Sequence, residues 1–355
     1  MKGKLLVLLQ LFVMAAYSQV KPANSFSNQI KEERFISING IGQWVTINGD
    51  STKPIILFLH GGPGSPLSPY ADAIYGNWKK EFLLVQWDQR GTAKTYGKNA
   101  PEELSPQYLQ SHPLTIEQMT SDGIELTRIL VKRFGKPKII LFGSSWGSVL
   151  GITMAQKAPE LFYAYIGHSQ IVDPAAGNLY AYNKLIQLAQ KSNDQQSLDI
   201  LYAIGKPPYD TARNAGRFMR IIKKYQQQNT TPAPSSWFVL SPDYDNEKDN
   251  QHRSDGDDYS FVNYTGDKRL GVSSMSAAIN FAKDALVFTV PVYFIQGEED
   301  IQTPAAINKA YFDKLKAPAK KFILLPKAEH GFNQAVIDAH YSIMKKYILP
   351  IISKP

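Results

Sequence analysis

Three unbroken apolar runs in the first half of the chain constrain its fold more than any other feature. They are 53–60 (KPIILFLH), 81–87 (EFLLVQW) and 136–142 (KPKIILF). A strand with one solvated face alternates apolar and polar residues, whereas a strand buried on both faces of a parallel sheet does not. The runs therefore predict buried parallel strands. Further strands are expected at 162–166, 290–296 and 321–325.

Helical patterns separate these runs. Thr115-Ile-Glu-Gln118 is typical of a capping box and predicts a helix that stops near Gly135. Other helices are expected at 146–157, 304–315 and 331–348, and a hairpin at 34–47. Because strands and helices alternate, we expect an α/β fold with a mainly parallel sheet flanked by helices.

The segment 168–282 breaks this alternation because it lacks apolar strand runs. It contains helical pieces at 175–191 and 211–227, and a polar span at 226–259 that we interpret as a loop. We predict that 168–282 is a mostly helical cap. It would be inserted between two parts of the core, 19–167 and 283–355.

The first residues have the three-part layout of a secretory signal peptide. Lys2 and Lys4 precede an apolar stretch at 5–16 that is too short to span a membrane, and Ala16-Tyr-Ser18 is a small-x-small cleavage triplet. We expect residues 1–18 to be removed and the protein to be periplasmic or secreted, without stable membrane insertion. The chain has no cysteine, so it contains neither a disulfide nor a lipid-anchor cysteine.

Charge and composition argue against several functional classes. The formal net charge is +8, but the basic residues are scattered singly and in pairs, without the basic stripe of a nucleic-acid-binding protein. The sequence has neither an H-E-x-x-H motif nor a Cys/His cluster. We therefore expect no nucleic-acid partner, no metal and no cofactor.

A G-x-S-x-G pattern follows the third apolar run. In Gly143-Ser-Ser145-Trp-Gly147 only Ser145 has glycine two positions away on both sides. A sharp strand-to-helix turn can lift this serine above the sheet, and bulky residues at the glycine positions would collide across the turn. Ser145 is therefore the candidate nucleophile.

A glycine-rich loop, His60-Gly-Gly-Pro-Gly64, directly follows the first apolar run. A serine hydrolase needs two N–H donors for the oxyanion, one from the residue after the nucleophile and one from such a loop. We assign these roles to Trp146 and Gly62, with Gly61 as the alternative. The motif does not continue as G-K-[ST], which excludes a phosphate-binding P-loop.

Two polar turns near the end of the chain contain candidates for the histidine base and for the acid that orients it. Gly297-Glu-Glu-Asp300 and Ala328-Glu-His330 each follow a predicted strand, in the chain order serine, acid, histidine. We expect His330 to take the proton of Ser145, and Asp300 to orient the imidazole. Glu298 and Glu299 are competing candidates for the acid.

These motifs resemble those of the α/β-hydrolase superfamily, and within it the proline iminopeptidase-like serine hydrolases. The resemblance rests on HGGPG at 60–64, WDQRGTAKT at 87–95, GSSWGS at 143–148, GEED at 297–300 and AEHG at 328–331. It implies an α/β-hydrolase fold, a helical cap over the site, and cleavage of N-terminal residues from peptides or action on amides and esters. It also implies that Asp88 and Arg90 brace the loop that contains His60 and Gly61.

The cap departs from this family in one respect. Family members bind the free amine of the substrate with cap carboxylates, commonly glutamates, whereas Glu247 is the only glutamate in 168–282. Asp173 or Asp210 could take that role. The expected substrate is a short peptide, and the alternative is a small acyl substrate of a carboxylesterase or amidase. A non-catalytic binding protein would lack a member of the triad, yet each role here has a candidate.

Overall fold

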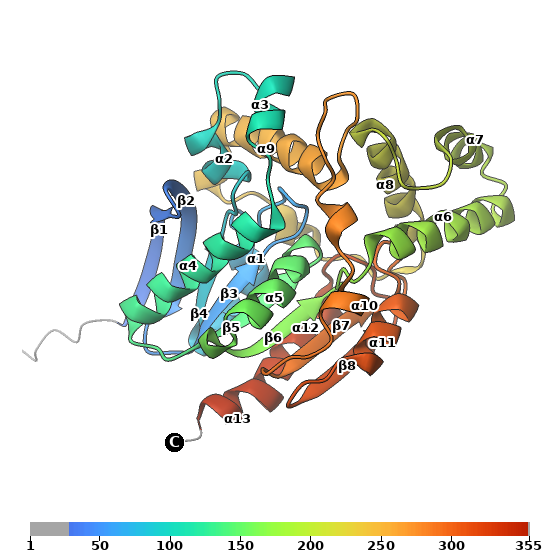
Figure 1. Ribbon diagram of the computed structural model, residues 1–355. Helices are drawn as coiled ribbons and strands as arrows, with labels where there is room; N and C mark the ends of the chain where they lie inside the picture. Colours follow the sequence, from blue (N-terminus) through green and yellow to red (C-terminus); the bar gives the residue numbers. More distant parts are fainter. Residues whose placement is uncertain (1–27, 354–355) are drawn as a thin grey trace, which may run out of the picture.

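The computed structural model describes residues 28–353 (Figure 1), so the predicted signal peptide at 1–18 lies outside the described residues. In this part of the chain, no helix combines the length and the apolar character needed to cross a membrane.

Residues 28–353 contain one eight-stranded sheet in the order β1-β2-β4-β3-β5-β6-β7-β8. Strands β3 to β8 pair in parallel, while β2 is antiparallel to both β1 and β4. The predicted mainly parallel α/β fold is thus confirmed. The strands are β1 (Gln29–Ile38), β2 (Ile41–Asp50), β3 (Ile55–Leu59), β4 (Leu83–Trp87), β5 (Ile139–Ser144), β6 (Phe162–His168), β7 (Val292–Gly297) and β8 (Lys320–Leu325).

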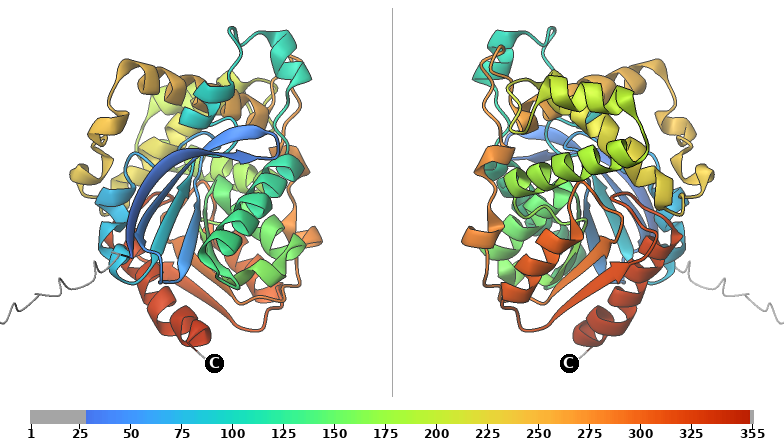
Figure 2. Two further views of the ribbon diagram at one scale, coloured as in Figure 1. Left: turned by 90° about the vertical axis from the view of Figure 1, so that its left-hand side faces the viewer. Right: turned by 90° about the vertical axis from the view of Figure 1, so that its right-hand side faces the viewer.

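Helices cover both faces of the sheet (Figure 2). The α-helices are α1 (Ala71–Tyr75), α2 (Ala93–Asn99), α3 (Pro106–Ser111), α4 (Ile116–Phe134), α5 (Trp146–Lys157), α6 (Pro174–Lys191), α7 (Gln195–Ile204), α8 (Ala212–Gln226), α9 (Glu247–Thr265), α10 (Phe281–Asp284), α11 (Ala305–Lys314), α12 (Gln334–Ile343) and α13 (Leu349–Ile352). A π-helical turn, Met344–Ile348, joins α12 to α13.

Strand β3 shows why its sequence does not alternate. Leu57 and Leu59 pack into the apolar cluster under α4 and α5, while Ile56 and Phe58 pack into the cluster under α1 and α12. All of these side chains are fully buried. Each face of the strand needs apolar residues, so the alternation typical of a half-exposed strand disappears.

The ends of α4 follow the predicted signals. The Thr115 hydroxyl accepts a hydrogen bond from the N–H of Gln118 at 3.1 Å. The helix ends at Gly135, whose φ of 59° is in the left-handed region that glycine adopts at low cost. Local chemistry therefore sets both ends of this helix.

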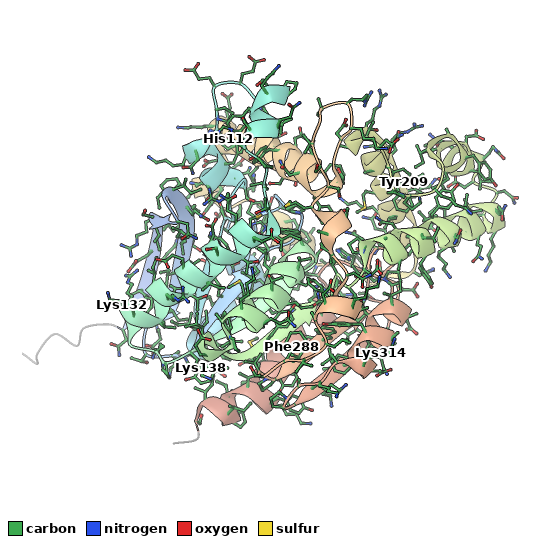
Figure 3. The ribbon with its side chains drawn as sticks, in the orientation of Figure 1. His112, Lys132, Lys138, Tyr209, Phe288 and Lys314 are labelled. Carbon is green, nitrogen blue, oxygen red and sulfur yellow. The ribbon has the colours of Figure 1, made fainter. Side chains whose placement is uncertain are left out.

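Of the helices between β6 and β7, α6, α7 and α8 lie together at the upper right of Figure 1, while α10 lies beside β7. Helices α6, α7 and α8 share an apolar cluster of their own that includes Leu185, Leu201 and Ile222. Tyr209, labelled in Figure 3 near α7 and α8, packs against this cluster. These helices therefore have a core separate from that of the sheet.

The interpretation of 226–259 as a loop is wrong in its second half, because α9 begins at Glu247. The Asn246 side chain caps this helix by accepting a hydrogen bond from the N–H of Asp249 at 2.9 Å. The buried face of α9 contains Gly256, Ser260 and Asn263 beside a single large apolar residue, Tyr259. Three of these four residues are small or polar, so the face does not form a periodic apolar stripe and the hydrophobic pattern gives little signal.

We predict that Gly147→Ala destabilises the protein strongly. A Cβ at Gly147 would lie 1.9 Å from the carbonyl oxygen of Leu59 and 2.7 Å from that of His60, and neither backbone atom can move without disturbing the sheet. We expect the free energy of unfolding to fall by about 3 kcal/mol in a urea titration. Gly76→Ala is the control, since its Cβ would meet nothing closer than 3.8 Å. Equal stabilities of the two variants would contradict the prediction.

Candidate functional site

Ser145 lies at the turn between β5 and α5. Its backbone has φ 50° and ψ −119°, a strained conformation for a residue with a side chain. A Cβ at Gly143 would lie 2.4 Å from the carbonyl oxygen of Gly147, so the turn closes only with glycine there. The spacing of glycines around Ser145 follows directly from this geometry.

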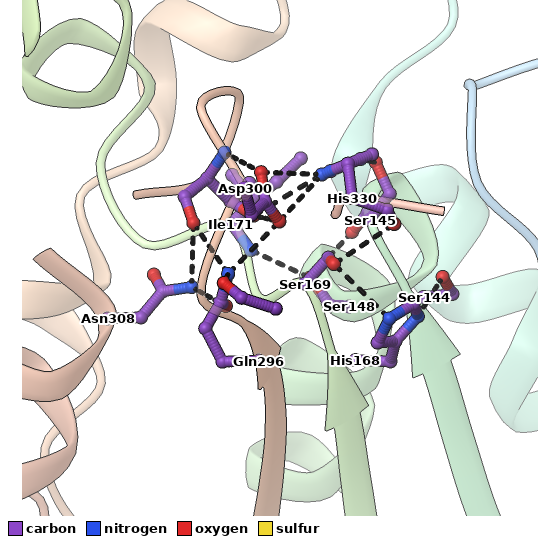
Figure 4. A network of polar contacts seen from close by, with 12 residues as sticks. Ser144, Ser145, Ser148, His168, Ser169, Ile171, Gln296, Asp300, Asn308 and His330 are labelled. Atoms are coloured by element: carbon purple, nitrogen blue, oxygen red, sulfur yellow. Dashed lines mark hydrogen bonds and ion pairs between the residues drawn. The ribbon is translucent and has the colours of Figure 1, made fainter. Parts of the chain in front are cut away.

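Ser145, His330 and Asp300 lie together at the carboxyl ends of β5, β8 and β7 (Figure 4). The Nε2 atom of His330 is 2.7 Å from Ser145 Oγ. The Nδ1 atom of the same ring is 3.0 Å from Asp300 Oδ2 and 3.2 Å from Oδ1. Of the three acids considered in this turn, Asp300 is the one bonded to the imidazole.

Asp300 is fixed by three further hydrogen bonds. Its carboxylate accepts from the Thr303 N–H at 2.7 Å, the Thr303 hydroxyl at 2.6 Å and the Gln296 amide at 3.0 Å. Burial alone would raise the pKa of Asp300, but the neighbouring His330 and the Thr303 hydrogen bonds outweigh it, so the pKa is lowered. An ionised Asp300 accepts the Nδ1 proton and leaves the Nε2 lone pair facing Ser145.

The glycine-rich loop lies directly against the serine. A Cβ at Gly61 would be 3.2 Å from Ser145 Cβ and 3.8 Å from its Oγ. Gly62 has φ 109°, which a residue with a side chain adopts only with strain. Trp146 is the first residue of α5, so its N–H belongs to the unsatisfied donors of a helix start. Gly61 therefore adjoins Ser145, while the oxyanion roles of Gly62 and Trp146 stay a prediction.

His60 and Gln89 lock this loop to the neighbouring strand end. The Gln89 N–H donates to His60 Nε2 at 3.2 Å, so the ring carries its proton on Nδ1 and donates it to the Gly61 carbonyl at 2.8 Å. Burial lowers the pKa of His60 to about 4, which keeps the ring neutral. The Gln89 side chain also links the His60 carbonyl to the indole N–H of Trp146. Gln89 was not predicted as a site residue, although it stands inside the DQRG motif at 88–91.

Asp88 and Arg90 contact different parts of the molecule. Asp88 accepts from the Ser68 hydroxyl at 2.5 Å and the Lys94 N–H at 3.3 Å, next to the glycine-rich loop. Arg90 instead forms an ion pair with Asp122 of α4 at 2.7 Å. It borders a separate cavity of about 730 Å³ that Tyr96 and Tyr108 also line. Asp88 therefore contacts Ser68, downstream of the loop at 60–64, and the bracing of that loop by Asp88 and Arg90 stays a prediction.

Three acidic residues between 168 and 282 were considered from the sequence as ligands for a substrate amine, and the structure places them as follows. Asp173 caps α6 through the Ala176 N–H, and it also accepts from Asn280. Asp210 forms an exposed ion pair with Lys268, and Glu247 begins α9. No group of three or more His, Cys, Asp or Glu side chains within 28–353 could hold a metal ion.

We predict that Asp88→Asn removes a pH dependence of stability. Burial raises the pKa of Asp88 to about 7, whereas an aspartate in the unfolded chain ionises near ~3.9. As the pH rises through this window, the unfolded state loses a proton that the folded state keeps. The wild type should therefore lose stability relative to the variant by up to about 1.4 kcal/mol per pH unit. Urea unfolding of both proteins at several pH values between about 4 and 7 measures the difference. Parallel pH profiles would refute the prediction.

Comparisons with known proteins show the family of the chain. Residues 54–333 match the family model described as alpha/beta hydrolase fold. The chain is 29% identical to a probable aminopeptidase, YbaC, of Bacillus subtilis (strain 168), over 83% of this chain and 89% of that protein. It is 34% identical to a probable proline iminopeptidase of Streptomyces coelicolor, but over only 33% of this chain and 32% of that protein.

The crystal structure of a proline iminopeptidase from Mycobacterium smegmatis superimposes with a TM-score of 0.65 at 15% identity, covering 90% of this chain and 98% of that one. The chain is therefore a hydrolase, and it belongs to the alpha/beta hydrolase fold family.

Proposed function

We propose that the protein is a serine hydrolase that releases N-terminal residues from short peptides, with Ser145, His330 and Asp300 as its catalytic triad. The observation that carries the proposal is the continuous chain of contacts from Asp300 through His330 to Ser145, with 2.7 Å between the imidazole and the hydroxyl. A nucleophile bonded to a base, which a third group orients, is the arrangement that activates a serine.

The proposed reaction proceeds in two halves. Ser145 Oγ attacks the carbonyl carbon while His330 Nε2 takes the hydroxyl proton, and Asp300 stabilises the imidazolium. The negative oxygen of the tetrahedral intermediate is met by the N–H of Trp146 and an N–H of the Gly61–Gly62 segment, next to the positive end of α5. His330 then gives the proton to the leaving amine. Water repeats the sequence on the acyl-enzyme and frees Ser145.

Two carboxylates beside the site support a substrate with a free amine. Asp257 of α9 accepts from the Ser65 hydroxyl at 3.0 Å, and its Cα would be 2.7 Å from a Cβ at Gly64, so it adjoins the glycine-rich loop. Glu329 directly precedes His330, and burial raises its pKa. Within 28–353 neither carboxylate forms an ion pair of its own. Burial raises the pKa of both carboxylates and the charge of Lys223 partly offsets this without an ion-pair contact, so a substrate ammonium group could pair with either one directly.

A carboxylesterase or amidase acting on a small acyl substrate is the second candidate. It is favoured by the positions of Asp173, Asp210 and Glu247, of which the first caps a helix and the second pairs with Lys268. The triad chemistry would be the same. The two functions differ in whether a positive charge on the substrate improves binding.

Ser145→Ala is predicted to abolish hydrolysis while leaving the fold intact. Removing the hydroxyl eliminates the nucleophile, and we expect kcat to fall by roughly 10⁴-fold or more with proline and alanine naphthylamides and with p-nitrophenyl acetate. A fluorophosphonate probe should label the wild type and not the variant. Labelling of the variant at the wild-type rate would show that another residue is the nucleophile.

Asp257→Asn is predicted to distinguish the two candidate functions. If Asp257 contacts the substrate ammonium, the variant should raise KM for alanine naphthylamide roughly tenfold, the scale of one charge-assisted hydrogen bond. KM for the uncharged p-nitrophenyl acetate should not change. Asp199→Asn removes the same charge from the exposed surface of α7 and is the matched control. Equal effects on both substrates would favour the esterase or amidase.

A further inference from the structure

A buried histidine that the proposed reaction does not use lies beneath the nucleophile. His168 is the last residue of β6 and its side chain is fully buried. Its carbonyl oxygen accepts the N–H of Ser145 at 3.0 Å. Its ring lies 3.0 Å from the Ser144 hydroxyl through Nδ1 and 3.3 Å from the Ser169 hydroxyl through Nε2 (Figure 4).

The carbonyl oxygen of His330, which can only accept, determines the direction of these hydrogen bonds. The Ser169 hydroxyl donates its only proton to the carbonyl oxygen of His330 at 3.1 Å, because a carbonyl oxygen can only accept. His168 must therefore donate to Ser169 from Nε2, and its bare Nδ1 accepts from Ser144. The resulting chain of hydrogen bonds runs from the residue before the nucleophile to the backbone of the base.

The surroundings of His168 keep it in this neutral form. Its ring stacks on Phe332 at 5.1 Å and meets the edge of His340 at the same centroid distance. Burial, followed by the charges of His340 and His330, lowers the pKa of His168 well below its usual range. A ring that stays neutral keeps one donor and one acceptor, as the hydrogen-bond chain requires.

The cost of this arrangement argues that it has a use. Ser169 has φ 47°, in the left-handed region that residues with a side chain rarely adopt. An apolar side chain at position 168 would fill the space without needing buried partners. In contrast, the observed residues connect two segments, Ser144–Ser145 and His330, that are far apart in the sequence.

We propose that His168 is a positioning residue: through Ser144 and Ser169 it holds the Ser145 turn and the His330 backbone at a fixed separation. The proposal rests on the proposed function, because it concerns the distance between the nucleophile and the base. A hydrolase of this kind is sensitive to such distances, since a misplacement of about 1 Å can cost a hundredfold in rate.

Two substitutions of similar polarity test the proposal. His168→Gln places an amide near the position of Nε2 and keeps a donor for Ser169 but loses the acceptor for Ser144, whereas His168→Asn reaches only the position of Nδ1 and loses the donor for Ser169. Because each variant breaks one of the two links, we expect each to lose roughly tenfold to a hundredfold in kcat with KM unchanged. Thermal unfolding of both variants monitors stability separately, and the rate of fluorophosphonate labelling should fall in parallel with kcat.

Ser169→Ala provides a second variant that alters only the link to His330. It should lower kcat to a similar degree, and combining it with His168→Asn should add little because both break the same chain. Folded variants that keep the wild-type kcat or lose only substrate affinity would overturn the proposal. If neither His168 variant folds, an unchanged kcat in Ser169→Ala overturns it. A wild type that neither turns over substrate nor reacts with the probe would instead reject the proposed function.

Discussion

The strained turn at Ser145 is the constraint on which the site depends. A φ of 50° directs the hydroxyl away from the sheet. At Gly143 and Gly147 the backbone lies so close to neighbouring carbonyl groups that a Cβ would not fit, which makes the turn tight. Strain of this kind persists only when the surrounding structure enforces it. Here β3 and β6 hold the turn from both sides, through the Leu59 carbonyl beside Gly147 and the His168 carbonyl bonded to the Ser145 N–H.

Hydrogen bonds between loops then complete the site around this turn. His60 and Gln89 connect the glycine-rich loop to the end of β4 and to Trp146, while Thr303 and Gln296 hold the acid. Nearly all of these groups are buried, where a satisfied hydrogen bond is strong and an unsatisfied one is costly. The preorganisation of the site therefore resides as much in uncharged side chains as in the triad.

The sequence allowed a prediction of the parts that local rules determine. The glycine spacing singles out Ser145, and the positions of Asp300 and His330 after strands place them at one edge of the sheet. Asp300 is preferred to its neighbours Glu298 and Glu299, but the sequence offers no decisive reason, because the choice depends on how the turn after β7 is oriented by Thr303. Gln89 and His168 were not predicted as part of the site, since their partners come from distant segments and leave no periodic signal.

Helix α9 illustrates the same limit for secondary structure. Its buried face combines one aromatic residue, Tyr259, with Gly256, Ser260 and Asn263, so it packs largely by close backbone approach and hydrogen bonds rather than by a continuous apolar stripe. The Ser260 hydroxyl, for example, donates to the carbonyl oxygen of Gly91 at 2.8 Å. Hydrophobic periodicity does not predict such a helix, and the local signal for it is the Asn246 cap.

The separate apolar core of α6, α7 and α8 has a consequence for how such a protein can change over generations. The chain leaves the sheet after β6 and returns at β7, and these two strands pair directly in parallel. Helices α6, α7 and α8 can therefore be lengthened, shortened or exchanged without altering the register between β6 and β7, whereas α9 is tied to the core through Ser260 and Gly91. Divergence in those three helices need not erode the spacing of Ser145, Asp300 and His330.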